Sequence, residues 1–160
     1  MTGGVTIRPL RTGERWLLTE FLYEAVWRPD GAPPVPRTVL QEAALRRYVE
    51  DFGRAADDRC LAAVCDGRVA GAVWVRRMHG FGHVDDATPE LAVALYPEYR
   101  GRGIGTLLLR AMLERLRQEG CVRVSLSVQR ENRAAAWYLR EGFELLAERD
   151  GELVMVCRLG

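Results

Sequence analysis

The most specific chemical signal in this 160-residue sequence is a glycine-rich segment in its second half, Pro97-Glu-Tyr-Arg-Gly-Arg-Gly-Ile-Gly105. An amphipathic run of leucine and methionine follows it and predicts a helix over about 103–119. The first N–H groups of a helix lack intrahelical partners and lie at the positive end of its dipole. Because glycine carries no Cβ, the backbone here can wrap closely around an anion. The segment therefore predicts a phosphate-binding loop, in preference to a turn that serves only packing.

The spacing of these glycines and the overall composition exclude two common phosphate sites. Gly101, Gly103 and Gly105 stand as Gly-x-Gly-x-Gly, whereas dinucleotide-binding loops have Gly-x-Gly-x-x-Gly after a first strand. All 23 basic residues are arginine. This excludes a P-loop lysine, and it also excludes a Schiff-base lysine or a lysine general base.

A second segment, Asn132-Arg-Ala-Ala-Ala-Trp-Tyr138-Leu-Arg-Glu-Gly142-Phe143, predicts a helix that starts at an asparagine and carries a tyrosine four residues before Gly-Phe. Together with Arg100-Gly-Arg-Gly103-Ile-Gly105, it resembles the two signatures of the GCN5-related N-acetyltransferase (GNAT) family. The second segment begins 27 residues after the glycine loop, beyond one predicted helix and one strand. The resemblance spans about residues 5–158.

This resemblance implies a fold and an acyl donor. The fold is α/β, with a mixed, mostly antiparallel sheet flanked by helices, and acetyl-CoA lies in a V-shaped cleft between strands at about 90–96 and 122–128. No metal is implied. The implied donor-binding residues are Val93, Ala94, Leu95, Arg100, Gly101, Arg102, Gly103, Ile104, Gly105, Thr106 and Asn132. One register of the second signature puts Glu131 in the place of Asn132, so both alternatives stay open.

The chemistry of acetyl transfer to an amine requires two proton carriers. A carboxylate near the cleft, or a water held by one, has to accept the proton of the amine. Glu90 is our candidate because it opens the strand that lines the cleft, with Asp85 and Asp86 as weaker alternatives in the preceding loop. Tyr138 matches the acid of the family, which protonates the CoA thiolate. The alternatives are that Glu90 is a solvent-exposed glutamate at the start of a strand and that Tyr138 is an aromatic residue that only packs within its helix.

The remaining pattern predicts a single domain over residues 1–160 with the element order β-α-α-β-β-β-α-β-α-β-β. Two hairpins are indicated by Asp66-Gly67 and Asp150-Gly151 between apolar runs. The predicted helices lie at about 12–27, 38–52, 103–119 and 132–141, and the predicted strands at about 5–8, 61–65, 69–75, 90–96, 122–128, 145–148 and 153–159.

The amino-acid composition limits which partners and ligands can be expected. The 23 basic and 22 acidic residues give a net charge of +1, which provides no electrostatic footprint for nucleic acid or an anionic membrane. The N-terminus has no apolar export segment, so a cytoplasmic location is expected. The four cysteines form no Cys-x-x-Cys pair and are interpreted as free thiols. His79 and His83 lack the further ligands that a metal site needs, so none is expected.

The sequence therefore predicts an acetyl-CoA-dependent N-acetyltransferase of a small-molecule or protein amine. A non-catalytic acyl-CoA sensor of the same fold and a plain nucleotide-binding module are the alternatives. The acceptor is not readable, although its pocket should involve the first two helices, the 33–36 loop and the 78–87 loop. Trp27, Tyr48 and Phe81 are interpreted either as pocket lining or as core. The oligomeric state stays open, with a homodimer among the alternatives.

Overall fold

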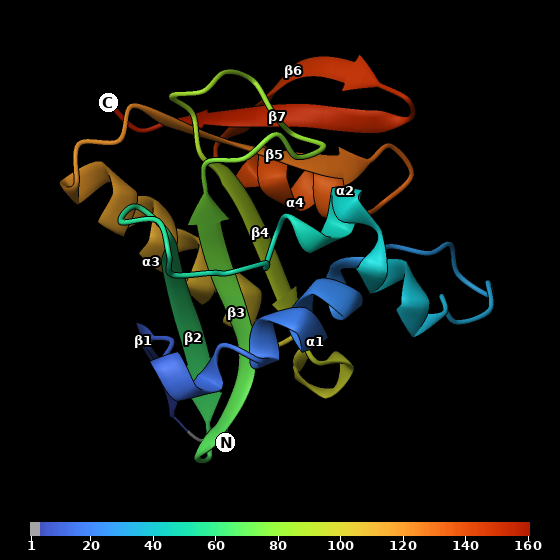
Figure 1. Ribbon diagram of the computed structural model, residues 1–160, viewed down its shortest axis with the longest axis vertical. Helices are drawn as coiled ribbons and strands as arrows, with labels where there is room; N and C mark the ends of the chain where they lie inside the picture. Colours follow the sequence, from blue (N-terminus) through green and yellow to red (C-terminus); the bar gives the residue numbers. More distant parts are fainter. Residues whose placement is uncertain (1–3) are drawn as a thin grey trace.

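The computed structural model describes residues 4–160, which form one seven-stranded sheet with helices on both faces (Figure 1). The strand order is β1-β2-β3-β4-β5-β7-β6. The strands are β1 (Val5–Pro9), β2 (Arg59–Cys65), β3 (Arg68–Arg76), β4 (Glu90–Leu95), β5 (Arg123–Gln129), β6 (Phe143–Arg149) and β7 (Glu152–Arg158). All neighbouring pairs are antiparallel except β4 and β5. The predicted mixed, mostly antiparallel fold is confirmed.

Both predicted hairpins are present because their turns have the required backbone conformation. Asp66 and Gly67 have φ values of 50° and 78°, and Asp150 and Gly151 have 51° and 79°. Two consecutive residues with positive φ match the right-handed twist of the strands that they connect. The first turn joins β2 to β3, and the second joins β6 to β7.

The sheet opens in its middle, between the two parallel strands. β4 and β5 share a single paired position, Glu90 opposite Ser125, where the Ser125 N–H donates to the Pro89 carbonyl at 3.0 Å. Beyond that point no ladder joins them within the described residues, although β4 stays paired with β3 and β5 with β7. The edge of β4 that faces β5 is therefore left without strand partners.

Two hydrophobic cores hold the two faces of this split sheet. Helix α3 (Ile104–Gln118) and helix α4 (Ala134–Arg140) pack on one face, around Leu108, Met112 and Tyr138. Helix α1 (Leu17–Ala25) and the following loops pack on the other, around Phe21 and Trp74. In Figure 1, α1 lies in front of the sheet and α3 behind it. A ligand between β4 and β5 is thus flanked by different elements on each side.

The predicted first two helices are shorter and more broken than the sequence suggested. The 12–27 helix divides into a 3-10 turn η1 (Thr12–Glu14) and α1, because Glu14 accepts hydrogen bonds from the Arg8 guanidinium at 2.8 Å and the Arg11 N–H at 2.9 Å. The 38–52 helix divides into η2 (Arg37–Gln41) and α2 (Ala43–Arg46), because Glu42 is extended, with ψ of 134°. One further 3-10 turn, η3 (Pro97–Tyr99), precedes the glycine loop.

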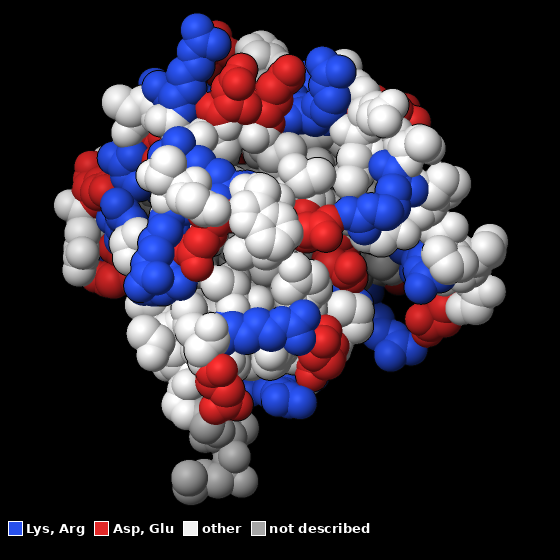
Figure 2. Space-filling model, turned by 60° about the horizontal axis from the view of Figure 1, so that its bottom comes forward, with Lys and Arg blue, Asp and Glu red and all other residues white. Residues whose placement is uncertain are grey.

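The surface mixes charges of both signs. On the face in Figure 2, basic and acidic side chains lie next to one another at several places, separated by uncharged surface. Among residues 4–160, no helix combines the length and hydrophobicity that crossing a lipid bilayer would require.

Candidate active site

A cleft of about 580 Å³ lies where β4 and β5 separate. It reaches both faces of the sheet, since α1 and the loop after it line one side and α4 lines the other. The sequence left open whether Trp27, Tyr48 and Phe81 line a pocket or belong to the core, and all three line this cleft. The lining residues on the strands are Leu91, Ala92, Val93, Ala94 and Leu95 of β4, Ser127, Val128 and Gln129 of β5, and Glu152 of β7.

The glycine loop forms a cradle of backbone N–H groups at the start of α3. Gly101 and Gly103 have φ values of 76° and 80°, and a Cβ added at either would meet nothing within 4 Å. The first helical hydrogen bond is donated by Leu107 to the Gly103 carbonyl. Within the described part of the chain, the N–H groups of residues 101–106 meet no acceptor. Consecutive unpartnered donors at a helix start fit a pyrophosphate.

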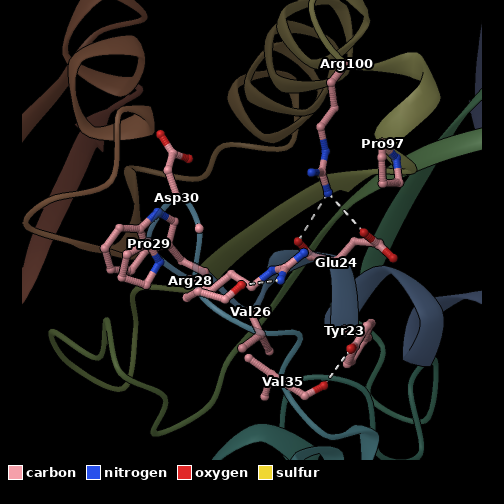
Figure 3. A pocket seen from close by; sticks show the side chains of 12 residues that line it. Tyr23, Glu24, Val26, Arg28, Pro29, Asp30, Val35, Pro97 and Arg100 are labelled. Carbon is pink, nitrogen blue, oxygen red and sulfur yellow. Dashed lines mark hydrogen bonds and ion pairs between the residues drawn. The ribbon is translucent and has the colours of Figure 1, made fainter.

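The two arginines of this loop differ in their contacts within the described residues, since Arg100 has an ion-pair partner and Arg102 has a ring contact only. Arg100 pairs with Glu24 of α1 at 3.1 Å and donates to the Leu95 carbonyl at 3.1 Å, and it lines a second cavity of about 610 Å³ beside the 26–35 loop (Figure 3). Arg102 lies over the Tyr99 ring at 5.6 Å. Arg100 thus ties β4 to α1 at the mouth of the cleft, and the backbone N–H groups of the loop stay without partners among the described residues.

Of the two alternatives at the start of α4, the structure places Asn132 in the wall of the cleft and leaves Glu131 exposed outside it. The Asn132 side chain accepts a hydrogen bond from the Ala134 N–H at 2.9 Å, and thereby satisfies one of the free donors of the helix. Val93, Ala94 and Leu95 lie on β4, whose edge toward β5 is unpaired here. These positions suit an extended ligand that adds to a strand edge.

Tyr138 lines the same cleft from the α4 side. Its ring packs against Trp137 at 4.9 Å and Phe143 at 5.6 Å between centroids. Trp137 in turn donates to the Thr106 hydroxyl at 3.0 Å, which fixes α4 on the start of α3. Within residues 4–160, the Tyr138 hydroxyl has no hydrogen-bond partner, and burial raises its pKa. The phenol therefore stays protonated at neutral pH and is available as a donor.

Glu90 lies behind the cleft, and its side chain is fully satisfied. The residue is 1% exposed and is absent from the cleft wall. Its carboxylate accepts hydrogen bonds from the Tyr48 hydroxyl at 2.8 Å, the Gly80 N–H at 2.9 Å and the Gly82 N–H at 3.1 Å. Burial raises the pKa of Glu90, and these donors oppose the rise. Its hydrogen-bonded link to the cleft is the Tyr48 hydroxyl, which itself accepts from the Phe81 N–H.

The loop that holds Glu90 contains glycine for steric reasons. A Cβ at Gly80 would lie 2.6 Å from the Glu90 carboxylate oxygens, and one at Gly82 would lie 2.6 Å from the Leu126 backbone. The segment 80–82 therefore passes close over β4 and β5 and presents Phe81 to the cleft. In the sequence, this close approach corresponds to the Gly-Phe-Gly triplet between His79 and His83.

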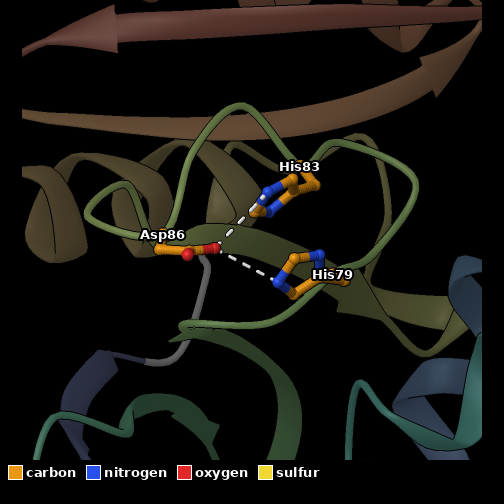
Figure 4. A group of neighbouring side chains, drawn as sticks. All are labelled: His79, His83 and Asp86. Carbon is orange, nitrogen blue, oxygen red and sulfur yellow. Dashed lines mark ion pairs between the residues drawn. The ribbon is translucent and has the colours of Figure 1, made fainter.

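Neither Asp85 nor Asp86 lines the cleft. Asp85 accepts from the Thr88 hydroxyl at 2.8 Å and pairs with Arg123 at 2.6 Å, and these partners lower the pKa of Asp85 to about 2. Asp86 instead lies beside His79 and His83, with separations of 3.1 and 3.7 Å between its Oδ1 and their Nε2 atoms (Figure 4). The ligand atoms of these three residues lie within 4.8 Å of one another, so the fold brings beside His79 and His83 a third group that the sequence analysis did not count; His79 and Asp86 are exposed.

Glu152 is the cleft residue that sequence reasoning missed. It is the first residue of β7, opposite Gln129 of β5, and the Gln129 amide donates to its Oε1 at 3.2 Å. Its Oε2 is buried and has no partner among the described residues. Burial raises the pKa of Glu152, and Ser127 and Gln129 oppose the rise only in part. The Asp150-Gly151 turn located the strand, but the β5–β7 pairing that brings it to the cleft carries no sequence signal.

A split parallel strand pair beside a helix-start phosphate cradle defines an acyl-CoA-binding transferase fold of the kind that the resemblance implied. The comparisons with known proteins agree, because the model of the acetyltransferase (GNAT) family matches residues 19–143. The chain belongs to this family. It is thus an N-acetyltransferase with acetyl-CoA as its acyl donor.

Individual relatives agree with this assignment. Glucosamine 6-phosphate N-acetyltransferase 1 from Oryza sativa subsp. japonica is 30% identical over 118 residues, which are 68% of this chain and 67% of that protein. Among solved structures, the PaiA N-acetyltransferase from Thermoplasma acidophilum in complex with coenzyme A has a TM-score of 0.73 at 18% identity, covering 97% of this chain and 99% of its own. The ribosomal-protein-alanine N-acetyltransferase from Brucella melitensis has a TM-score of 0.68 at 22% sequence identity. The match covers 96% of this chain and 99% of that one.

Proposed function

We propose that this protein transfers the acetyl group of acetyl-CoA to a primary amine by direct attack of the amine on the thioester, in the cleft between β4 and β5. The observation that carries this proposal is the cradle of six N–H groups at residues 101–106, which have no partner among the described residues, beside the unpaired edge of β4. The cradle suits the pyrophosphate, and the strand edge suits the pantetheine arm through Val93, Ala94 and Leu95.

Tyr138 is the proposed acid of the reaction. It belongs to the core on the α3–α4 face of the sheet. Glu90, Ser127 and Gln129 point to the opposite face, because residues paired across strands, and alternate residues along a strand, share a face. An amine arriving from that second face and a thiolate leaving toward Tyr138 are thereby kept apart, as direct attack requires.

The role that we propose for the Glu90 carboxylate follows from its position behind the cleft. Its carboxylate is held by three donors, and its hydrogen-bonded link to the cleft is the hydroxyl of Tyr48, which does line the cleft. The carboxylate also holds Gly80 and Gly82, and with them Phe81, against the cleft. The backbone N–H groups of the β4 edge are available to stabilise the developing charge on the thioester oxygen.

Donor binding is tested with a matched pair of glycine variants. Gly103 and Gly120 have φ values of 80° and 81°, and a Cβ at either meets nothing within 4 Å. Gly103→Ala and Gly120→Ala therefore carry the same backbone strain, but only Gly103 lies in the cradle. Acetyl-CoA at 100 times its dissociation constant should add about 2.7 kcal/mol to wild-type stability. We expect the Gly103→Ala variant to lose much of this thermal shift and Gly120→Ala to keep it. Equal shifts would contradict the assignment of the loop.

Acetyl transfer itself is tested by release of the CoA thiol together with the mass of the acetylated amine. We expect Tyr138→Phe to lower kcat at least about tenfold, or about 1.4 kcal/mol of transition-state stabilisation, with little change in acetyl-CoA affinity. The loss should shrink with an acyl donor that has a more acidic thiol. A wild-type protein that binds acetyl-CoA but acetylates no amine would instead be the non-catalytic sensor.

A further inference from the structure

We propose that Glu152, together with Ser127 and Gln129, is the subsite that receives the acceptor as an ammonium ion and takes its first proton. The inference rests on the proposed function, because it identifies where the attacking amine binds in that cleft. It also commits to an acceptor class: a primary amine with no phosphate group close to the reacting nitrogen.

The position of Glu152 fits this role. The ladder places Glu152 opposite Gln129, and Gln129 shares a face of β5 with Ser127. All three residues line the cleft, as does Tyr48. This is the same face as Glu90, opposite to the core that contains Tyr138. Glu152 therefore lies on the side from which the amine would approach.

The hydrogen bonding of Glu152 is incomplete. Oε1 accepts from the Gln129 amide at 3.2 Å, and the Ser127 side chain lies close enough to lower the pKa of the carboxyl, but the buried Oε2 meets no donor in hydrogen-bond geometry within residues 4–160. Buried polar atoms are almost always paired with protein, water or ligand groups, so this atom requires a partner. Oε2 is closed to solvent as it lies, so the Glu152 carboxylate has to turn toward the cleft to receive an ammonium ion, which then supplies both the hydrogen bond and the opposite charge. A neutral or anionic ligand would leave the carboxylate uncompensated.

No cation of the described residues neutralises Glu152. Arg149 stands opposite it in the hairpin register, but its guanidinium donates to the His83 carbonyl. On the β4 side, the Tyr48 hydroxyl donates its hydrogen bond to Glu90. It therefore does not donate to Glu152, and Glu90 itself carries no positive charge that could compensate Glu152. Burial and the Ser127 and Gln129 side chains are the causes of its pKa shift, with no charged group among them.

The other charges in the cleft point to the same acceptor class. The charged lining residues are Glu24, Glu42, Glu152 and Arg100. The one arginine is paired with Glu24 at 3.1 Å, so Glu42 and Glu152 leave the lining with a net negative charge. Such a lining attracts an ammonium ion and disfavours a phosphate, unless Arg100 leaves its partners. This differs from what the name of the Oryza relative, a glucosamine 6-phosphate acetyltransferase, would suggest for the acceptor.

The proton and bond balance of the step is complete. One N–H bond of the ammonium breaks, and its proton passes to Glu152. The nitrogen lone pair then forms the C–N bond at the thioester carbon, the C–S bond breaks, and Tyr138 gives its proton to the thiolate. The second proton of the amine nitrogen restores Tyr138 through solvent, and Glu152 releases its proton to water. One proton is therefore released for each amide formed.

The test compares wild type, Glu152→Gln and Glu148→Gln with three probes: n-butylamine, glucosamine and glucosamine 6-phosphate. Glu148 lies on the same hairpin, pairs with Arg130 at 3.1 Å and is outside the cleft, so it is the matched control. We expect Glu152→Gln to lower kcat/KM for n-butylamine and glucosamine by about 10²-fold or more, because a positioned base is lost. The limb of the kcat/KM profile that rises with pH through the Glu152 pKa should disappear as well. The acetyl-CoA thermal shift should stay unchanged.

The outcomes separate the inference from the proposed function. Glucosamine should be a better substrate than its phosphate, and a clear preference for glucosamine 6-phosphate would overturn the acceptor class. If wild type is active and Glu152→Gln has the same kcat/KM and the same acidic limb, the subsite assignment is wrong while the proposed function stands. If wild type acetylates none of the probes, the proposed function fails and the inference fails with it.

Discussion

Two carboxylates on the same face of the split sheet differ in how completely they are satisfied. Glu90, where β4 and β5 meet, is 1% exposed and accepts three hydrogen bonds. Glu152, where they have separated, accepts one from Gln129 and keeps a buried oxygen without a partner in the described chain.

The comparison shows that burial and a raised pKa do not by themselves identify a reacting group. Both carboxyls have a pKa above the ordinary range, in both cases because of burial. Partners distinguish them, since a carboxylate that already holds three donors has little to offer a ligand. Glu90 therefore acts mainly as a positioning residue for the loop that carries Phe81, whereas Glu152 has one carboxylate oxygen for which the described residues supply no partner.

The largest effect on stability should come from Glu90→Gln. The amide replaces one acceptor oxygen by an NH₂ group, which then faces a buried N–H donor of Gly80 or Gly82. Leaving such a donor unpaired costs about 2–3 kcal/mol, which lowers Tm by about 5–10 °C. Thermal and urea unfolding measure this loss, and Glu152→Gln should show none of it. Equal destabilisation of the two variants would remove the distinction between the carboxylates.

A smaller loss is expected for Tyr48→Phe. The hydroxyl of Tyr48 links Glu90 to the Phe81 N–H, so its removal breaks two hydrogen bonds and costs about 1–2 kcal/mol. Because the two residues share one network, the double variant Tyr48→Phe with Glu90→Gln should lose less stability than the two single losses added together. Strict additivity in urea unfolding would show that the two side chains act independently.

The smallest effect concerns the pH dependence of stability. A carboxyl whose pKa is raised by folding keeps its proton in the folded state after the unfolded chain has lost it. The free energy of unfolding therefore falls as pH rises from the unfolded pKa, about 4.3, toward the folded one. Glu152→Gln removes this contribution. Its stability relative to wild type should thus increase as pH rises above the unfolded pKa of about 4.3, as followed by urea unfolding. A difference that stays constant over this range would contradict the raised pKa.

The elements expected to hold the donor could be predicted from the sequence more fully than the residues that line the acceptor side. The glycine loop and the Asn132 helix are local signals, because their function depends on the backbone of one short segment. The two Asp-Gly turns are equally local, and the structure has both hairpins. The first two predicted helices were too long, because the contacts of Glu14 and the extended Glu42 interrupt a pattern that is helical in its periodicity.

The acceptor side depends on contacts between segments that are distant in sequence. Glu152 reaches the cleft because β7 inserts between β5 and β6, and Glu90 is closed off because Tyr48 and the 80–82 loop converge on it. Neither event leaves a periodic pattern or a motif. The prediction that Glu90 lies near the split was sound, but its partners, which decide its role, could not be read from one strand.

The most direct test of this account is a crystal structure with a CoA conjugate in which an alkylamine nitrogen is linked to the sulfur through an acetyl bridge. We predict that the pyrophosphate contacts the N–H groups of residues 101–106, that the sulfur lies beside the Tyr138 hydroxyl, and that the amine nitrogen lies within hydrogen-bond distance of Glu152 Oε2. A nitrogen placed away from Glu152, with Oε2 still lacking a partner, would contradict the account.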